Sequence, residues 1–225
     1  MSLTPIEELL ADLDEPNSYP RELSWLSFNA RVLQEAQDKE VPLIQRVRYL
    51  GIFSNNLDEF FRVRVAEVRR LISLSSGKRH QRAEKLLAAI QYRVLLLQQD
   101  FEIIYAKLLR ELARKGVYLI NETQLQDDQL AFVEAFFHSK VLPELEPILL
   151  RDDQPIPNLA DESLYLAVDI DTNSGPQYAL LEVPTNRLGR FIEIPGRKGG
   201  KGRVFIVLDN IIRACLPQVF RGVFE

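Results

Sequence analysis

The residues RAEKLLAAIQYRVLLLQQDFEIIYAKLLRELAR, numbers 82–114, form the longest stretch of the chain with one regular hydrophobic period. Apolar side chains recur there in alternating steps of three and four residues, which is the spacing of a narrow stripe along a helix. The stripe consists of Leu87, Ile90, Val94, Leu97, Phe101, Ile104 and Leu108. Gly116 follows closely and suits the end of a helix. We therefore predict one long arm of a helical bundle, with a partner helix from a second chain as the alternative.

A shorter helix is predicted near the N-terminus. Ser24 is a favourable N-cap residue, because its hydroxyl can accept a hydrogen bond from a free N–H group of the first turn. A helix of about three turns should follow and bury one apolar face. That face would consist of Trp25, Phe28, Val32 and Ala36.

Two more helices are predicted between these stretches. Pro42 favours a helix start, because its missing N–H group would be unpaired there in any case. The inner stripe of this helix would consist of Leu43, Ile44, Val47 and Leu50. Gly51 weakens its end, and Ser54-Asn55-Asn56 predicts a break, because such side chains compete for backbone hydrogen bonds. The next helix should cover residues 57–73.

The pattern changes after Gly116, where short apolar runs alternate with prolines and turn residues. Strands are predicted at 117–120, 164–170, 178–183 and 203–207, and helices at 126–141 and 208–216. Asn173-Ser174-Gly175-Pro176 is typical of a hairpin turn. The predicted fold class is α+β, an all-helical N-terminal bundle followed by an α+β domain with antiparallel strands. The expected divisions are a leader arm at 1–20, a helical domain at 21–115 and a second domain at 116–225.

Composition limits the function classes. The chain has 225 residues, of which 46% are hydrophobic and 27% charged, and this composition is typical of a globular protein. Its net charge of −4 argues against binding to nucleic acid through an overall positive charge. Its single cysteine, Cys215, lies in an apolar run and is expected to be a buried, inert thiol. Neither a signal peptide nor an apolar run of about 18 residues is present, which predicts a cytoplasmic protein without a transmembrane segment.

Most catalytic motifs are absent. His80 and His138 have no second ligand at metal spacing, so both are expected to be solvated surface histidines. The stretch Gly196 to Arg203 is rich in glycine and basic residues and invites comparison with a phosphate-binding loop. It lacks a Ser or Thr after the lysine, and a strand rather than a helix is predicted next, so a basic hairpin loop is favoured.

Residues 49–65, YLGIFSNNLDEFFRVRV, combine two adjacent asparagines with a following acidic pair and arginines. Asn55, Asn56, Asp58 and Glu59 suit a helix start without any ligand. Arg62 and Arg64, with further arginines nearby, could face a polyanion, because the guanidinium fork matches phosphate oxygens. The alternative is a solvated helix face balanced by acidic residues.

This segment and residues 21–36, RELSWLSFNARVLQEA, together resemble the N-terminus of bacterial polyphosphate kinases of the first, larger type. The likeness continues through YLAV at 165–168, YALLEVP at 178–184 and LDNII at 208–212. It covers nearly everything from Arg21 onward. Two long motifs of unusual composition, in the right order, make it specific.

The resemblance implies an N-terminal helical domain, a head domain involved in dimerisation, and two C-terminal phospholipase D-like domains. Such enzymes transfer the terminal phosphate of ATP reversibly to inorganic polyphosphate through a phosphorylated histidine in the C-terminal half, with Mg²⁺ assisting. Asn56 matches the family's nucleotide contact, for ATP or ADP, and its amide can both donate and accept hydrogen bonds against a purine edge. Asn55, Arg62 and Arg64 are candidate supporting residues. The chain itself is expected to hold neither catalytic residues nor metal ligands.

On this resemblance the chain stops at Glu225 within the head domain, so we expect it to be inactive without the C-terminal catalytic domains. We expect a homo-oligomer in the full enzyme and no nucleic-acid partner. The alternative function is a helical interaction or dimerisation module without a ligand site of its own. A third possibility, polyanion or RNA binding through the arginines, predicts affinity that weakens with added salt.

Overall fold

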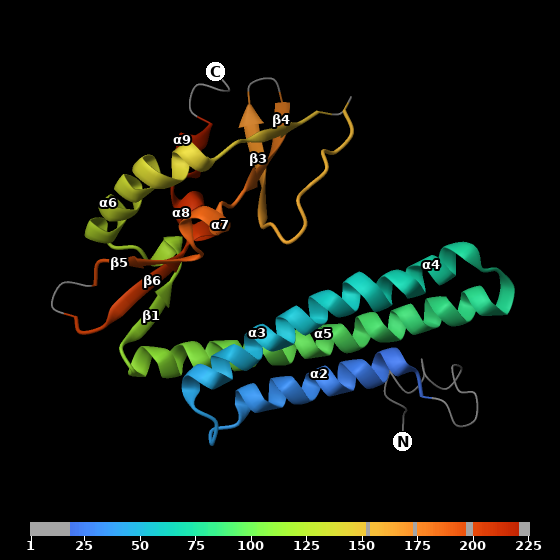
Figure 1. The fold of residues 1–225 in the computed structure, drawn as a ribbon. Coiled ribbons are helices and arrows are strands. Elements are labelled where there is room, and N and C mark those ends of the chain that lie inside the picture. The colour runs from blue at the N-terminus through green and yellow to red at the C-terminus, as the bar shows by residue number, and fades with distance from the viewer. Residues whose placement is uncertain (1–18, 152–153, 173–174, 197–199, 221–225) are drawn as a thin grey trace. The chain divides into compact units, whose positions relative to one another are not determined.

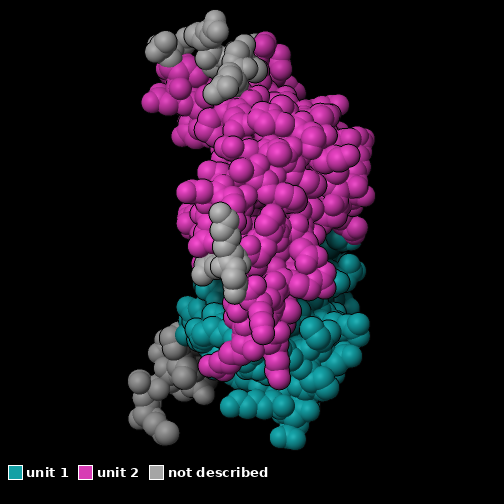
Figure 2. Space-filling view, turned by 90° about the vertical axis from the view of Figure 1, so that its left-hand side faces the viewer, with its two compact units in different colours: residues 1–111 teal, residues 112–225 magenta. Residues whose placement is uncertain are grey.

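A computed structural model describes residues 19–151, 154–172, 175–196 and 200–220 of the chain. It divides into two compact units, residues 1–111 and residues 112–225, which Figure 2 shows in different colours. Each unit is described by itself below. The predicted leader arm at 1–20 lies almost wholly outside the described residues, as do Asn173 and Ser174, the first two residues of the predicted turn at 173–176.

The first unit is all helical, as predicted (Figure 1). Its elements are α2 (Arg21–Gln37), α3 (Leu43–Phe60), a π-helical turn (Phe61–Val65), α4 (Ala66–Leu74) and α5 (Gly77–Arg114). The helix α5 has 38 residues and confirms the long helix predicted from the hydrophobic period, although it begins five residues earlier than predicted.

The predicted stripe of α5 lies in the core of this unit. Five of its seven residues are buried, and Leu87 and Phe101 are partly buried against them. Their neighbours in the same core come from α2 and α3 and include Leu26, Phe53 and Phe60. The stripe is therefore covered within its own unit. This confirms the predicted arm of a helical bundle and not the alternative, in which a helix of a second chain would cover the stripe.

The start and the buried face of α2 differ from the prediction. The helix begins at Arg21 after Pro20, so Ser24 lies inside the first turns and is not the N-cap. Phe28 is 56% exposed, and the buried face is rotated away from it. The buried residues are Glu22, Leu23, Leu26, Asn29, Leu33 and Ala36. A polar residue, Asn29, occupies the middle of this face, and that interruption hides the true stripe from a purely hydrophobic pattern.

The predicted break at Ser54-Asn55-Asn56 is wrong. The chain is helical from Leu43 to Leu74, through α3, the π-helical turn and α4. The Asn56 amide donates a hydrogen bond to Asn29 and so does not compete with the backbone of its own helix. Phe53 and Phe60 are buried on either side of the asparagines, and this packing outweighs the weak helix propensity of Asn and Ser.

The buried face of α3 also differs from the prediction, because a charged residue occupies one of its positions. Ile44 is 59% exposed and Val47 is also exposed, whereas Arg46 is buried. The Arg46 guanidinium donates to the Ala36 carbonyl oxygen at 2.9 Å and to Glu111 Oε2 at 2.7 Å. It thus joins the end of α2 to the end of α5 through α3.

The second unit is α+β, which confirms the predicted fold class. Its helices are α6 (Asp127–Phe136), α7 (Thr185–Leu188), α8 (Leu208–Ala214) and α9 (Leu216–Val219), with a π-helical turn at Phe137–Val141 and short 3₁₀ turns at Glu122–Gln124 and Leu142–Glu144. Its strands are β1 (Val117–Ile120), β2 (Ile148–Leu150), β3 (Tyr165–Thr172), β4 (Gly175–Glu182), β5 (Phe191–Ile194) and β6 (Arg203–Val207).

Two three-stranded sheets organise this unit, in the orders β1-β6-β5 and β2-β4-β3. The predicted hairpin is confirmed, because β3 and β4 pair antiparallel along their full length, from Tyr165 opposite Glu182 to Thr172 opposite Gly175. One pairing departs from the predicted antiparallel arrangement: β1 and β6 run parallel, with Val117 opposite Arg203. The predictions missed β2 and β5, which have only three and four residues.

The core of the second unit lies between these strands and the helices α6 and α8. Fully buried members include Phe137, Leu181, Ile206 and Ile211, and Cys215 is buried with them as predicted. Burial raises the pKa of the Cys215 thiol to about 11, and the negative charge of Glu134 adds to the effect. The thiol is therefore protonated and unreactive at neutral pH.

Candidate functional site

Asn56 and Asn29 meet at the crossing of α3 and α2. Asn56 is partly buried, and its Nδ2 donates to Asn29 Oδ1 at 3.1 Å. Asn29 is 0% exposed, and its own Nδ2 donates to the backbone carbonyl oxygen of Phe53 at 3.1 Å. A chain of two side-chain amides thus ends on the backbone of α3. Within the described residues, no hydrogen bond to Asn56 Oδ1 is found, and this atom is not among the buried unpaired polar atoms.

Aromatic rings form the apolar part of this region. Trp25 on α2 stacks on Phe60 with ring centroids 4.7 Å apart and an interplanar angle of 17°. Phe60 also meets the edge of Phe61, which opens the π-helical turn. Such turns are inserted irregularities that recur at functional sites. The stack joins α2 to α3 one turn beyond Asn56.

The predicted supporting residues lie on the same continuous helix, each with a different environment. Asn55 is exposed. Arg62 lies 4.0 Å from Glu59, and Arg64 lies 3.4 Å from Glu67, both as pairs three residues apart. These contacts match the predicted alternative of a helix face balanced by acidic residues. Arg46, another arginine upstream, is buried against Glu111 and does not belong to an exposed basic face.

The histidines differ from each other. His138 is exposed, in line with a surface histidine. His80 lies in the first turn of α5 rather than in a loop, its Nδ1 is 2.9 Å from the Ile72 carbonyl oxygen, and its Nε2 is 3.3 Å from Glu84. It therefore connects the end of α4 to the start of α5, and with a side chain that is 36% exposed it fits the predicted solvated surface histidine only in part.

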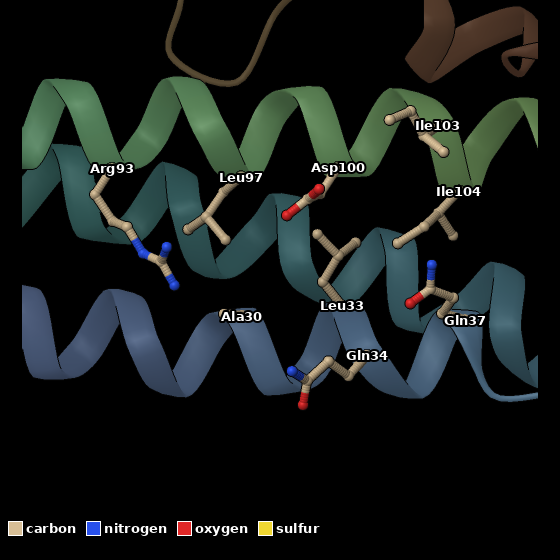
Figure 3. Close-up of a pocket in the computed structure, with 9 residues that line it drawn as sticks. All are labelled: Ala30, Leu33, Gln34, Gln37, Arg93, Leu97, Asp100, Ile103 and Ile104. Carbon is tan, nitrogen blue, oxygen red and sulfur yellow. The ribbon is translucent and has the colours of Figure 1, made fainter. Parts of the chain in front are cut away.

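A groove between α2 and α5 holds several polar side chains (Figure 3). Gln34 and Gln37 extend from α2, and Arg93 and Asp100 extend from α5. Its volume is about 190 Å³, below the range of roughly 300–1,000 Å³ that is typical of small-molecule sites. The groove is too small to enclose a nucleotide.

A larger hollow of about 440 Å³ lies near the start of α2. Arg21, Arg79 and Arg82 line it. Glu22 is also in its lining, and Arg21 is close to Glu22 and Glu67, at 3.2 and 3.9 Å. These carboxylates offset much of the positive charge of the arginines, so the hollow is not a strongly basic site.

The glycine-rich basic stretch from Gly196 to Arg203 joins two strands of one sheet, with residues 197–199 outside the described residues. The strands β5 and β6 pair antiparallel on either side of it, which confirms a hairpin loop and excludes a phosphate-binding loop followed by a helix. Arg203 on β6 donates to Glu193 on β5 at 2.8 and 2.7 Å. This bidentate hydrogen bond holds the pKa of the Glu193 carboxyl below its ordinary value.

In the described ranges, no group of three or more His, Cys, Asp or Glu side chains is placed to hold a metal ion. The same part of the chain contains no helix with the length and apolar character needed to cross a membrane. The candidate binding contact is the predicted Asn56, with the Asn29 amide beside it at the α2–α3 junction.

Comparisons with known proteins place both units of the chain among the domains of polyphosphate kinases. The profile of the polyphosphate kinase N-terminal domain matches residues 19–120, and that of the polyphosphate kinase middle domain matches residues 128–224. The two matches are consecutive and together include most of both units. The chain therefore belongs to the polyphosphate kinase family.

Individual relatives agree with this assignment. The polyphosphate kinase of Vibrio cholerae is 50% identical over 207 residues, which is 91% of this chain and 30% of that protein. The polyphosphate kinase of Escherichia coli K12 is 44% identical over the same length. The crystal structure of the Porphyromonas gingivalis polyphosphate kinase matches 92% of this chain with a TM-score of 0.80 and 34% identity. The chain spans about 30% of the length of these relatives.

Proposed function

We propose that this chain forms the nucleotide-covering helical unit and the following α+β head unit of an enzyme that transfers the terminal phosphate of ATP reversibly to inorganic polyphosphate. The main support for this proposal is the environment of Asn56. Its side-chain amide donates to Asn29, and its side-chain carbonyl oxygen has no partner among the described residues. An amide fixed in this way can bind one edge of a purine base without first losing its own rotational freedom.

The phosphoryl-transfer residues are proposed to lie outside this chain. Both ring nitrogens of His80 have partners in the helical unit, and His138 is an exposed side chain next to Phe137. Phosphoryl transfer needs positioned charges around the moving phosphate, and the described arginines near Asn56 are neutralised by Glu59 and Glu67. Among the described residues, no group of His, Cys, Asp or Glu side chains is placed to hold Mg²⁺, and the metal ligands are likewise proposed to lie outside this chain. The head unit is proposed to contribute to a homo-oligomer.

A hybrid enzyme tests this proposal. The matched segment of the Vibrio cholerae polyphosphate kinase would be replaced by this chain, and ATP-dependent polyphosphate synthesis would be measured. We expect an active hybrid in which Asn56→Ala raises the KM for ATP about tenfold, the loss of one to two hydrogen bonds. The KM for polyphosphate should not change. An Asn56→Ala hybrid with an unchanged KM for ATP would contradict the nucleotide contact.

A further inference from the structure

The buried amide of Asn29 has only one chemically consistent orientation. One of its two side-chain hydrogen-bond partners on α3 is the Phe53 carbonyl oxygen, which can only accept a hydrogen bond. The Asn29 nitrogen must therefore face Phe53, and the Asn29 oxygen must face the opposite way, toward Asn56. Rotating the Asn29 amide by 180° would place two acceptors together in a site that is 0% exposed and so out of reach of bulk solvent.

The orientation of Asn29 then determines that of Asn56. Asn29 Oδ1 lies 3.1 Å from Asn56 Nδ2 and can only accept, so Asn56 must direct its Nδ2 group toward Asn29 as the donor. Asn56 Oδ1 is left as an acceptor on the other side, together with the second hydrogen of Nδ2. A partly buried asparagine would otherwise exchange its two ends freely; here a fully buried residue on another helix removes that choice.

We infer that Asn29 is a positioning residue that fixes the Asn56 amide in the orientation that suits adenine and rejects guanine. This inference rests on the proposed nucleotide contact. Adenine presents an amino group beside a ring-nitrogen acceptor, and an asparagine amide can pair with both at once through its oxygen and one N–H group. Guanine presents only acceptors, O6 and N7, on the corresponding edge. An outward Asn56 oxygen would therefore face the O6 oxygen and lose the bond.

The test is an NMR titration of the complete 225-residue chain with millimolar ATP and GTP, which detects weak binding. The reported signals are the side-chain amides of Asn56 and, as an internal reference, of the exposed neighbour Asn55. We expect ATP to shift the Asn56 signals with an affinity about tenfold higher than that of GTP, the discrimination of one good amide–base pair. Equal affinities for ATP and GTP would overturn the inference.

Asn29→Leu removes the control over Asn56 while keeping a similar volume. It should reduce the preference for ATP to within about threefold, mainly because ATP binding weakens: a turned Asn56 amide makes neither bond to adenine, whereas guanine accepts one bond in either orientation. A purely structural role of Asn29 would weaken both nucleotides equally and leave their ratio unchanged, and that result would also overturn the inference. Gln34→Leu, an amide replaced at an exposed position of the same helix, is the matched control and should keep the tenfold ratio.

One measurement needs no substitution and so does not depend on whether Asn29→Leu folds. In the unmodified chain, the Asn56 side-chain amide protons should exchange with solvent at least about tenfold more slowly than those of Asn55, because the hydrogen bond to Asn29 must open first. Exchange as fast as that of Asn55 would overturn the fixed orientation. Failure of the proposed function gives a different result: neither nucleotide would shift the Asn56 signals, whatever their exchange rates.

Discussion

Gly202 and Gly116 approach so closely that a Cβ atom on Gly202 would lie 2.5 Å from the Gly116 carbonyl oxygen. The contact is at the start of the parallel pairing of β1 with β6, where the Arg203 N–H group donates to that same oxygen at 2.8 Å. Gly202 has φ +136° and Gly116 has φ +78°, both in the region that favours glycine. The two glycines therefore allow the only parallel strand pair among the described residues to form.

Gly202→Ala should strongly destabilise the α+β unit. The added methyl group meets the Gly116 backbone and the Tyr118 ring at 2.8 Å, and the backbone conformation is itself unfavourable for alanine. We expect a loss of about 2–4 kcal/mol in the free energy of unfolding. Urea denaturation followed by far-UV circular dichroism measures it, and a loss below about 0.5 kcal/mol would show that the strands adjust without cost.

Gly51→Ala should have the opposite effect and is the matched comparison. Gly51 lies inside α3, is exposed, and a Cβ atom there would meet nothing within 4 Å. Alanine loses less backbone entropy than glycine in a helix, so the variant should gain about 0.5–1 kcal/mol in the free energy of unfolding. The same denaturation experiment applies, and a destabilised variant would contradict an uninterrupted helix through residue 51.

Cys215 predicts a specific dependence of stability on pH. Its pKa is about 11 in the folded chain against an ordinary value of 9.0, so the folded state retains a proton that the unfolded state releases between these values. The protonated thiol therefore contributes its full share of the free energy of unfolding below pH 9. That contribution is lost as the pH rises toward 11, by at most about 1.4 kcal/mol per pH unit. Denaturation at pH 8 to 10.5 should show a steeper loss in the unmodified chain than in Cys215→Ala.

The alanine variant serves as the control, because other groups titrate in the same range in both proteins and cancel in the difference. Identical pH slopes would show that the thiol does not titrate abnormally. Reaction with iodoacetamide gives an independent reading at pH 8. The folded chain should react slowly and the urea-unfolded chain quickly, since only the thiolate is nucleophilic and it needs access.

How far the sequence predicts the fold depends on what interrupts the hydrophobic period. The helix α5 follows directly from its stripe, because each stripe residue is apolar and lies in the core. The face of α2 could not be found in this way, because Asn29 lies at its centre and its partner is the backbone of another helix. The continuity of α3 was hidden for the related reason that Asn56 is bonded across helices rather than to its own backbone.

The candidate site shows the same limit. Family resemblance indicated Asn56, but helix-start chemistry explained the same asparagines without a ligand. Asn29 lies 27 positions away, and no local pattern in one sequence pairs two amides at that separation. Arg46 could be counted with the other arginines in sequence, yet only the packing of three helices reveals that it is buried. Non-local hydrogen bonds of buried polar residues are therefore the part that sequence patterns do not supply.

Arg46→Met should destabilise the helical unit. Methionine fills part of the same space but leaves the Ala36 carbonyl oxygen and the Glu111 carboxylate without the donors they have now, at 2.9 and 2.7 Å. Because Glu111 is partly exposed and can turn to water, the expected loss is about 2 kcal/mol, less than for a fully buried ion pair.

Arg48→Met, at an exposed position of the same helix, is the control and should change stability by no more than about 0.5 kcal/mol. Fluorescence provides a local readout, because the single tryptophan, Trp25, stacks on Phe60 in this unit. Equal midpoints for the two variants in urea would show that the buried guanidinium adds nothing to the packing of the three helices.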